Sequence, residues 1–102
     1  MDTIVQAKRV LEIFKEMSQI PRGSGNEKGI SDYIVNFAHN LGLETTQDSE
    51  FNVVIKKPAT PGYENRPTVI LQGHIDMVCV KGHDSNHDFE KDPIANIIEG
   101  EW

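Results

Sequence analysis

Hydrophobic residues recur every three or four positions in two stretches of the chain, and this spacing predicts two amphipathic helices. The first helix is expected from Thr3 to the residue before Pro21, because proline pushes its predecessor out of helical geometry. Its apolar face comprises Val10, Leu11, Phe14, Met17 and Ile20. The second helix is expected between Ser24 and Gly42. Its apolar face comprises Ile30, Tyr33, Ile34, Phe37, Ala38 and Leu41.

Each predicted helix begins with two residues at the spacing of a capping box. The pairs are Thr3 with Gln6 and Ser24 with Glu27. In a capping box, each side chain binds a backbone N–H that the first helical turn leaves without a partner. We therefore expect these pairs to start the two helices.

Short runs of β-branched and apolar residues follow the second helix and predict strands. Leu43–Thr46 is a short candidate and Asn52–Lys56 a better one, whereas residues 58–67 hold three prolines and predict a loop. Thr68–Gln72 is almost continuously apolar, which is typical of an interior strand covered on both faces. Ile94–Trp102 is a further candidate strand. Helices followed by strands predict an α/β fold, with both helices packed on a mixed or parallel sheet.

Length and composition limit the class of protein. A chain of 102 residues with a net charge of −6 allows one small domain and argues against nucleic acid or an anionic membrane as a partner. The longest strictly apolar run, Met77–Val80, is too short to span a bilayer. Asp2, Lys8 and Arg9 stand where a signal peptide would be apolar. The single cysteine, Cys79, excludes an internal disulfide and fits the reducing cytoplasm.

Candidate chemistry lies directly after the predicted interior strand, where open α/β sheets place their ligands. In extended chain, side chains two residues apart share a face, so His74 and Asp76 are expected to point the same way, about 6.6 Å apart. This arrangement suits a carboxylate that binds one imidazole nitrogen while the other nitrogen faces a metal ion. The alternative interpretation is a surface pair at the end of a strand, because the spacing itself is common.

Two other histidines have metal-ligand spacing but an unfavourable setting. His83 and His87 would share the face of a helix, yet the residues around them are poor helix formers, which favours a solvated loop. The stretch from Asp84 resembles the start of a calcium loop, but Phe89 and Ala95 replace the glycine and glutamate that such a loop needs.

The glycine-rich turn and the cysteine have simple structural explanations. Gly23–Gly25 follows a helix, whereas a dinucleotide-binding glycine motif follows a strand, so turn geometry explains these glycines better than a phosphate site. Cys79 lies in an apolar run and is expected to pack as a small hydrophobic residue, not to act as a nucleophile.

Three stretches of the chain have informative sequences: Pro21–Glu27, Gln72–Val78 and His87–Ile94. Together they resemble the aminoacyl-histidine dipeptidases (peptidase D, Xaa-His dipeptidase) of the di-zinc metallopeptidase superfamily, which includes aminoacylases and carboxypeptidase G. The Gly-His-x-Asp-x-Val core is shared by the superfamily, and the flanking stretches point to the dipeptidase branch. The resemblance covers nearly the whole chain. It implies that residues 1–102 are the N-terminal portion of a catalytic domain, with a partial zinc-peptidase-like three-layer fold.

The resemblance also implies a metal site. His74 matches a zinc ligand, and Asp76 matches the catalytic carboxylate that orients it. Family members hold two Zn²⁺ ions with a bridging aspartate and water, and a glutamate removes the proton of the water that attacks the dipeptide carbonyl. Another divalent ion such as Co²⁺ or Mn²⁺ is an alternative, and the substrate that the resemblance implies is a dipeptide ending in histidine.

The chain departs from the family pattern in what it lacks. Members carry the bridging aspartate in a glycine-rich stretch after a tryptophan like Trp102, followed by a Glu-Glu pair that this chain does not contain. We therefore expect the isolated chain to be inactive, and to self-associate through an exposed sheet edge or an uncovered apolar face. Two alternatives stay open. One is another di-zinc enzyme, such as an aminoacylase or tripeptidase, and the other is a non-catalytic binding or assembly module.

Overall fold

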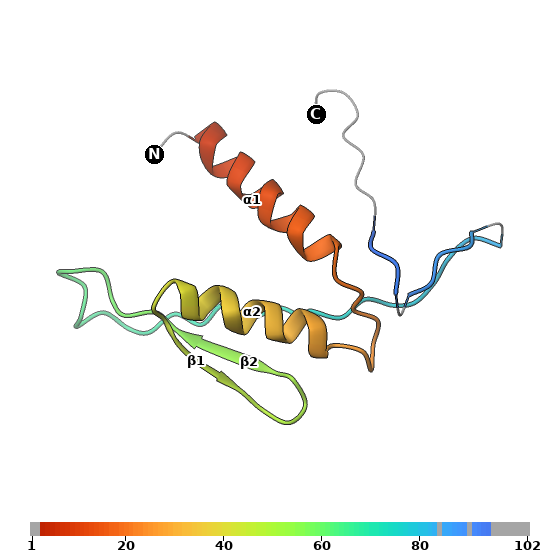
Figure 1. The fold of residues 1–102 in the computed structure, drawn as a ribbon. Helices are drawn as coiled ribbons and strands as arrows, with labels where there is room; N and C mark the ends of the chain where they lie inside the picture. Colours follow the sequence, from red (N-terminus) through yellow and green to blue (C-terminus); the bar gives the residue numbers. More distant parts are fainter. Residues whose placement is uncertain (1–2, 84, 90, 95–102) are drawn as a thin grey trace.

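The computed structural model describes residues 3–83, 85–89 and 91–94, and it begins with two helices (Figure 1). Helix α1 spans Thr3–Ser18 and helix α2 spans Lys28–Asn40, so both predicted helices are confirmed. At the end of α1, the buried Ser18 side chain donates a hydrogen bond to the Phe14 carbonyl at 2.8 Å. Pairing of the Thr3 side chain with Gln6 lies outside what the structure describes and stays a prediction.

The predicted capping box of α2 is wrong. The residue that precedes α2 is Glu27, and no side chain caps its first turn. Ser24 lies three residues earlier and donates its hydroxyl to Asp76 at 2.5 Å. The Glu27 carboxylate accepts a hydrogen bond from the Gly25 backbone N–H at 2.6 Å. The helix starts too late for Ser24 to reach its open N–H groups, which leaves the Ser24 hydroxyl free for another partner.

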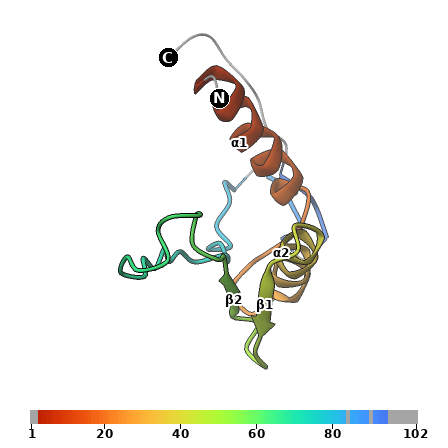
Figure 2. The same cartoon turned by 90° about the vertical axis from the view of Figure 1, so that its left-hand side faces the viewer.

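A two-stranded sheet packs against α2 (Figure 2). Strands β1 (Glu44–Gln47) and β2 (Val53–Lys56) are antiparallel, with Glu44 opposite Lys56. We expected a mixed or parallel sheet, and an antiparallel strand pair is compatible with the mixed sheet but not with the parallel one. Among the described residues, however, parallel pairing is limited to one isolated bridge, Gly23 with Met77, and a third layer is not seen.

Helix α2 carries one buried serine that binds the hairpin and two buried apolar side chains. Ile30 and Ala38 are 0% and 1% exposed and form the small core. The buried hydroxyl of Ser31 donates to the Phe51 carbonyl at 2.8 Å and accepts a hydrogen bond from the Gln47 amide at 2.6 Å. These bonds hold the loop between β1 and β2 against the helix.

The predicted interior strand Thr68–Gln72 is not covered. Val69, Ile70 and Leu71 are 80%, 84% and 92% exposed, and no strand is assigned to them. A groove of about 650 Å³ separates this segment from β2. The apolar pattern specifies what a strand would bury, but burial and pairing both need neighbouring strands, and the described residues provide none on this segment.

Helix α1 is also largely uncovered, because it projects away from α2 and the sheet (Figures 1 and 2). Val10, Leu11 and Phe14 are 66%, 52% and 52% exposed, so the expectation that its apolar face lies in a core is wrong for the described structure. The chain exposes 8895 Å², compared with about 5,800 Å² for a folded monomer of its mass. Much apolar surface is therefore available for further packing.

Two expectations concern the ends of the fold. Ile94 donates its N–H to the Ser18 carbonyl at 2.8 Å, while the rest of the candidate strand Ile94–Trp102 lies outside the described residues. No helix in the described part of the chain has the length and apolar character to cross a bilayer.

The small core predicts a large effect of one substitution. Ile30→Ala should lower the free energy of unfolding by about 2–5 kcal/mol, because it removes three buried carbons and leaves a cavity. Ile70→Ala is the matched control, since Ile70 is 84% exposed and its loss should change stability by no more than about 0.5 kcal/mol. Urea unfolding followed by circular dichroism measures both. Equal midpoints for the two variants would contradict the assignment of the core.

Candidate functional site

The segment that carries His74 is held by the loop between α1 and α2. Met77 donates its N–H to the Arg22 carbonyl at 2.8 Å, and the Ser24 N–H donates to the Met77 carbonyl at 3.1 Å. Between Arg22 and Ser24 lies Gly23, which is buried and forms an isolated parallel β-bridge with Met77. A Cβ on Gly23 would lie 2.3 Å from the sulfur of Cys79, so a larger residue here would force the Cys79 side chain to move.

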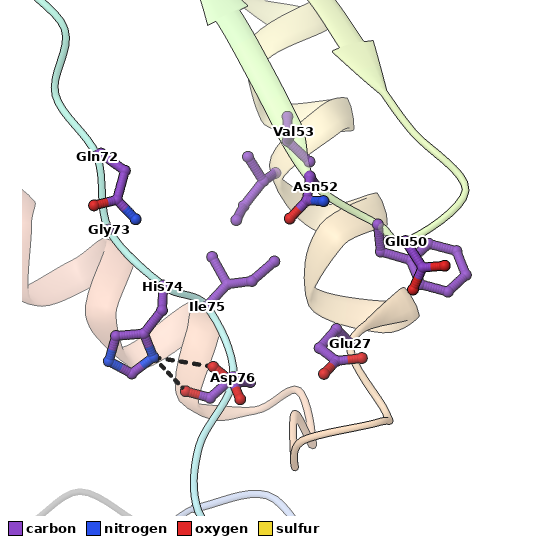
Figure 3. Close-up of a pocket in the computed structure, with 11 residues that line it drawn as sticks. Glu27, Glu50, Asn52, Val53, Gln72, Gly73, His74, Ile75 and Asp76 are labelled. Atoms are coloured by element: carbon purple, nitrogen blue, oxygen red, sulfur yellow. Dashed lines mark hydrogen bonds and ion pairs between the residues drawn. The ribbon is translucent and has the colours of Figure 1, made fainter.

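His74 and Asp76 meet as their spacing predicts. The His74 Nδ1 atom lies 3.0 Å from the Asp76 Oδ1 atom and 3.0 Å from the Asp76 carbonyl oxygen (Figure 3). An ionised carboxylate and a carbonyl can only accept, so Nδ1 carries the proton and donates it. In the neutral ring this leaves a lone pair on Nε2, which is the form in which histidine binds a metal ion. The His74 side chain is 82% exposed and accessible.

The Asp76 carboxylate has a second partner that the sequence analysis missed. Ser24 donates its hydroxyl to Asp76 Oδ2, while Oδ1 faces His74, so each carboxylate oxygen receives one side-chain donor. The hydrogen bond from Ser24, and after it the one from His74, hold the pKa of Asp76 below its ordinary value. The carboxylate therefore stays ionised, which keeps it an acceptor for the imidazole N–H.

A cleft of about 580 Å³ opens beside this pair. It is lined by Glu27, Ile34, Glu50, Phe51, Asn52, Val53, Gln72, Gly73, His74, Ile75 and Asp76. Figure 3 shows Glu27 and Glu50 across the cleft from His74. The cleft thus joins three segments: the extended chain after residue 71, the start of α2, and the loop between β1 and β2.

The loop between β1 and β2 forms its wall through a local network. The Asp48 carboxylate accepts hydrogen bonds from the N–H groups of Glu50 and Asn52 and from the Asn52 side chain, each at 2.9 Å. Phe51 has a φ angle of 65°, an uncommon conformation for a residue with a side chain. Its carbonyl is bound by Ser31 of α2. The loop is therefore held from both sides and gives the cleft a defined wall.

The site holds one candidate metal ligand. Among the described residues, no group of three or more His, Cys, Asp or Glu side chains is arranged to hold a metal ion. His83 and His87 are not on a helix, in agreement with the predicted loop. The His87 ring packs edge-on against the Phe89 ring, with 4.7 Å between the ring centroids. Asp84, at the start of the calcium-like stretch, lies outside the described residues.

Cys79 differs from expectation in its burial. Its side chain is exposed, although its sulfur lies against Gly23. The glycine turn agrees with the structural explanation, since Gly23 allows a close approach and Gly25 has a φ angle of 89°.

The chain is similar to known peptidases. It is 46% identical over 91 residues to the cytosol non-specific dipeptidase of Escherichia coli, which covers 89% of this chain and 19% of that protein. It is 28% identical to a probable carboxypeptidase of Emericella nidulans, covering 74% of this chain and 19% of the relative. The structure matches the crystal structure of aminoacylhistidine dipeptidase from Vibrio alginolyticus with a TM-score of 0.82 and 47% identity, over 89% of this chain and 19% of the other. No protein-family model matches the chain.

These similarities confirm the resemblance to the aminoacyl-histidine dipeptidases over most of the chain, and the carboxypeptidase relative supports the wider superfamily. The chain spans 19% of the length of each of these relatives.

The hydrogen bonds of Asp48 in the loop between β1 and β2 lead to a prediction about pH. Hydrogen bonds from the Asn52 side chain and backbone keep the pKa of Asp48 below its ordinary value of about 4. The stability that this loop gains from ionised Asp48 should therefore be complete above about pH 4 and be lost as the pH falls through the lowered pKa. An NMR titration should show that Asn52→Ala raises the pKa of Asp48. Asn36→Ala, an exposed site on α2, is the control and should not. An unchanged pKa in Asn52→Ala would refute the network.

Proposed function

We propose that residues 1–102 form the N-terminal portion of the catalytic domain of a longer metal-dependent dipeptidase that hydrolyses aminoacyl-histidine dipeptides. The similarity to named dipeptidases, one of them an aminoacylhistidine dipeptidase, supports the peptide-bond chemistry. One geometric observation carries the proposal. His74 Nδ1 donates its proton to Asp76, so that Nε2 keeps a lone pair with which it can bind a metal ion.

The donor set fits one side of a metal centre. In this proposal His74 holds a Zn²⁺ ion through Nε2, and another divalent ion such as Co²⁺ or Mn²⁺ is the alternative. The complete site would hold two ions, which when bound polarise the substrate carbonyl and lower the pKa of water. The remaining ligands and the glutamate general base would come from residues beyond Trp102, since the chain contains no Glu-Glu pair.

Asp76 acts in this proposal through the imidazole of His74. Its ionised carboxylate accepts the Nδ1 proton, which fixes the tautomer, limits rotation of the ring and raises the basicity of Nε2. The adjacent cleft, at about 580 Å³, lies within the usual range for small-molecule sites and would receive the dipeptide.

Partners and location follow from the same proposal. A dipeptide is the substrate, and the net charge of −6 continues to argue against nucleic acid or an anionic membrane surface. A cytoplasmic location is supported by the single cysteine and by the cytosol dipeptidase among the relatives.

Two alternatives have support of their own. The carboxypeptidase relative favours a different substrate in the same superfamily. The lack of a three-donor metal group in the described residues favours a non-catalytic module with this fold. A transplant experiment separates the non-catalytic module from a catalytic portion, and hydrolysis of β-alanyl-histidine by the full-length protein separates the dipeptidase from another superfamily member.

The transplant replaces the matching segment of the Escherichia coli cytosol non-specific dipeptidase with this chain. The hybrid should hydrolyse β-alanyl-histidine in a chelator-sensitive manner, whereas the isolated chain should hydrolyse nothing, because it supplies one ligand and no general base. A hybrid that folds but is inactive would contradict the proposal. Activity of the isolated chain that a chelator abolishes would contradict the division of the site.

Substitutions in the hybrid then test the individual roles. His74→Ala should remove both bound zinc and activity, whereas Asp76→Asn should keep part of the zinc and lower activity by about 10- to 100-fold, because only the orienting charge is lost. Metal content is measured by atomic emission. His39→Ala, at an exposed position on α2, is the control and should change neither quantity. Equal zinc loss in the His74 and Asp76 variants would overturn the roles.

The uncovered apolar surface predicts self-association of the isolated chain. Val69, Ile70 and Leu71 are exposed beside a groove along β2, and an unpaired apolar segment of this kind favours pairing with a second copy. Sedimentation velocity should show larger species as concentration rises. The double substitution Val69→Lys with Leu71→Lys should reduce them.

The matched control places two lysines in the loop after β2, as Thr60→Lys with Asn65→Lys, and should leave the association unchanged. A strictly monomeric wild-type chain at high concentration would contradict this expectation.

A further inference from the structure

We propose that Ser24 is a positioning residue of the metal site, whose hydroxyl fixes the Asp76 carboxylate and, through it, the orientation of the His74 ring. The inference rests on the proposed function in one respect, the use of His74 as a metal ligand. It adds a third member to the pair, from a loop 52 residues away in sequence.

The carboxylate geometry supports a chain of three side chains. Ser24 donates to one oxygen of Asp76 at 2.5 Å, and the other oxygen lies 3.0 Å from His74 Nδ1. With one donor on each oxygen, the carboxylate plane is held from both ends. Without Ser24, one oxygen would turn toward solvent, and either oxygen could face the imidazole.

The backbone brings the Ser24 hydroxyl to this place. The Ser24 N–H binds the Met77 carbonyl at 3.1 Å, and the Met77 N–H binds the Arg22 carbonyl at 2.8 Å. The Arg22 guanidinium in turn donates to the Met17 carbonyl in the last turn of α1 at 2.5 Å. Ser24 is therefore attached to the ligand-bearing segment by its main chain as well as its side chain.

The usual structural role of a serine at this point is already excluded. Helix α2 begins at Lys28 behind Glu27, so Ser24 does not cap it. The Ser24 side chain is exposed, so removal of its hydroxyl leaves no buried cavity. The fold should tolerate Ser24→Ala, and any effect on His74 can be separated from unfolding.

The first test measures the His74 tautomer in the metal-free 102-residue chain by long-range ¹H–¹⁵N NMR. The His74 signals are assigned by their loss in His74→Gln. In the wild type the neutral ring should carry its proton on Nδ1. Ser24→Ala should raise the fraction of the Nε2–H tautomer, while the Asp76 carbonyl, 3.0 Å from Nδ1, keeps Nδ1–H the major form. Ser24→Thr, which keeps the hydroxyl, should restore the wild-type pattern. Ser49→Ala, an exposed serine in the β1–β2 loop, is the matched control and should have no effect.

The second test measures Zn²⁺ affinity of the hybrid dipeptidase by competition with a chromogenic chelator. Ser24→Ala should weaken binding by about 3- to 10-fold. Removal of a carboxylate that binds the metal-ligating histidine typically weakens metal binding by about 10- to 100-fold. The effect of Ser24 should be smaller, because Ser24 contacts the carboxylate and not the histidine. Ser24→Thr should again resemble the wild type.

The outcomes distinguish this inference from the proposed function. If Asp76→Asn changes the tautomer and zinc affinity while Ser24→Ala changes neither, the role of Ser24 is refuted and the metal site stands. If the wild-type ring carries its proton on Nε2, the His74–Asp76 geometry is refuted and the proposed site falls with it. If Ser24→Thr behaves like Ser24→Ala, the effect does not come from the hydroxyl and the inference is also refuted.

Discussion

The two backbone hydrogen bonds between Met77 and the loop after α1 are the constraint on which the site depends. They join segments that are far apart in the chain, and between them lies Gly23, whose missing side chain leaves room for the sulfur of Cys79. Once the segments are joined, Ser24 faces Asp76, and Asp76 faces His74. The orientation of an exposed histidine thus follows from main-chain contacts behind it.

Local signals in the sequence were enough for the helices, the hairpin strands and the histidine–carboxylate pair. Helix α2 follows from its periodic apolar face and β2 from its β-branched residues, because both patterns act within a few residues. The contact between His74 and Asp76 follows from extended geometry over two residues. These predictions need no knowledge of distant parts of the chain.

Features that depend on distant partners were not predictable. The apolar run Val69–Leu71 indicates a buried strand, but its exposure is decided by whether neighbouring strands are present. The spacing of Ser24 and Glu27 fits a helix cap, whereas the real partner of Ser24 lies 52 residues away. The Asp48–Asn52 network could have been recognised, since aspartate often binds the backbone N–H groups that follow it in a turn.

The large exposed surface and the 19% coverage of its relatives both fit a chain whose helices and extended segment are covered by further structure in the proposed enzyme. A crystal structure of the zinc-loaded hybrid, with anomalous scattering at the zinc edge, tests the central claim most directly. We predict a zinc peak about 2.0–2.1 Å from His74 Nε2, with Nδ1 still bound to Asp76 and Ser24 on the opposite carboxylate oxygen. Zinc bound through Nδ1, or no zinc at His74, would contradict the account.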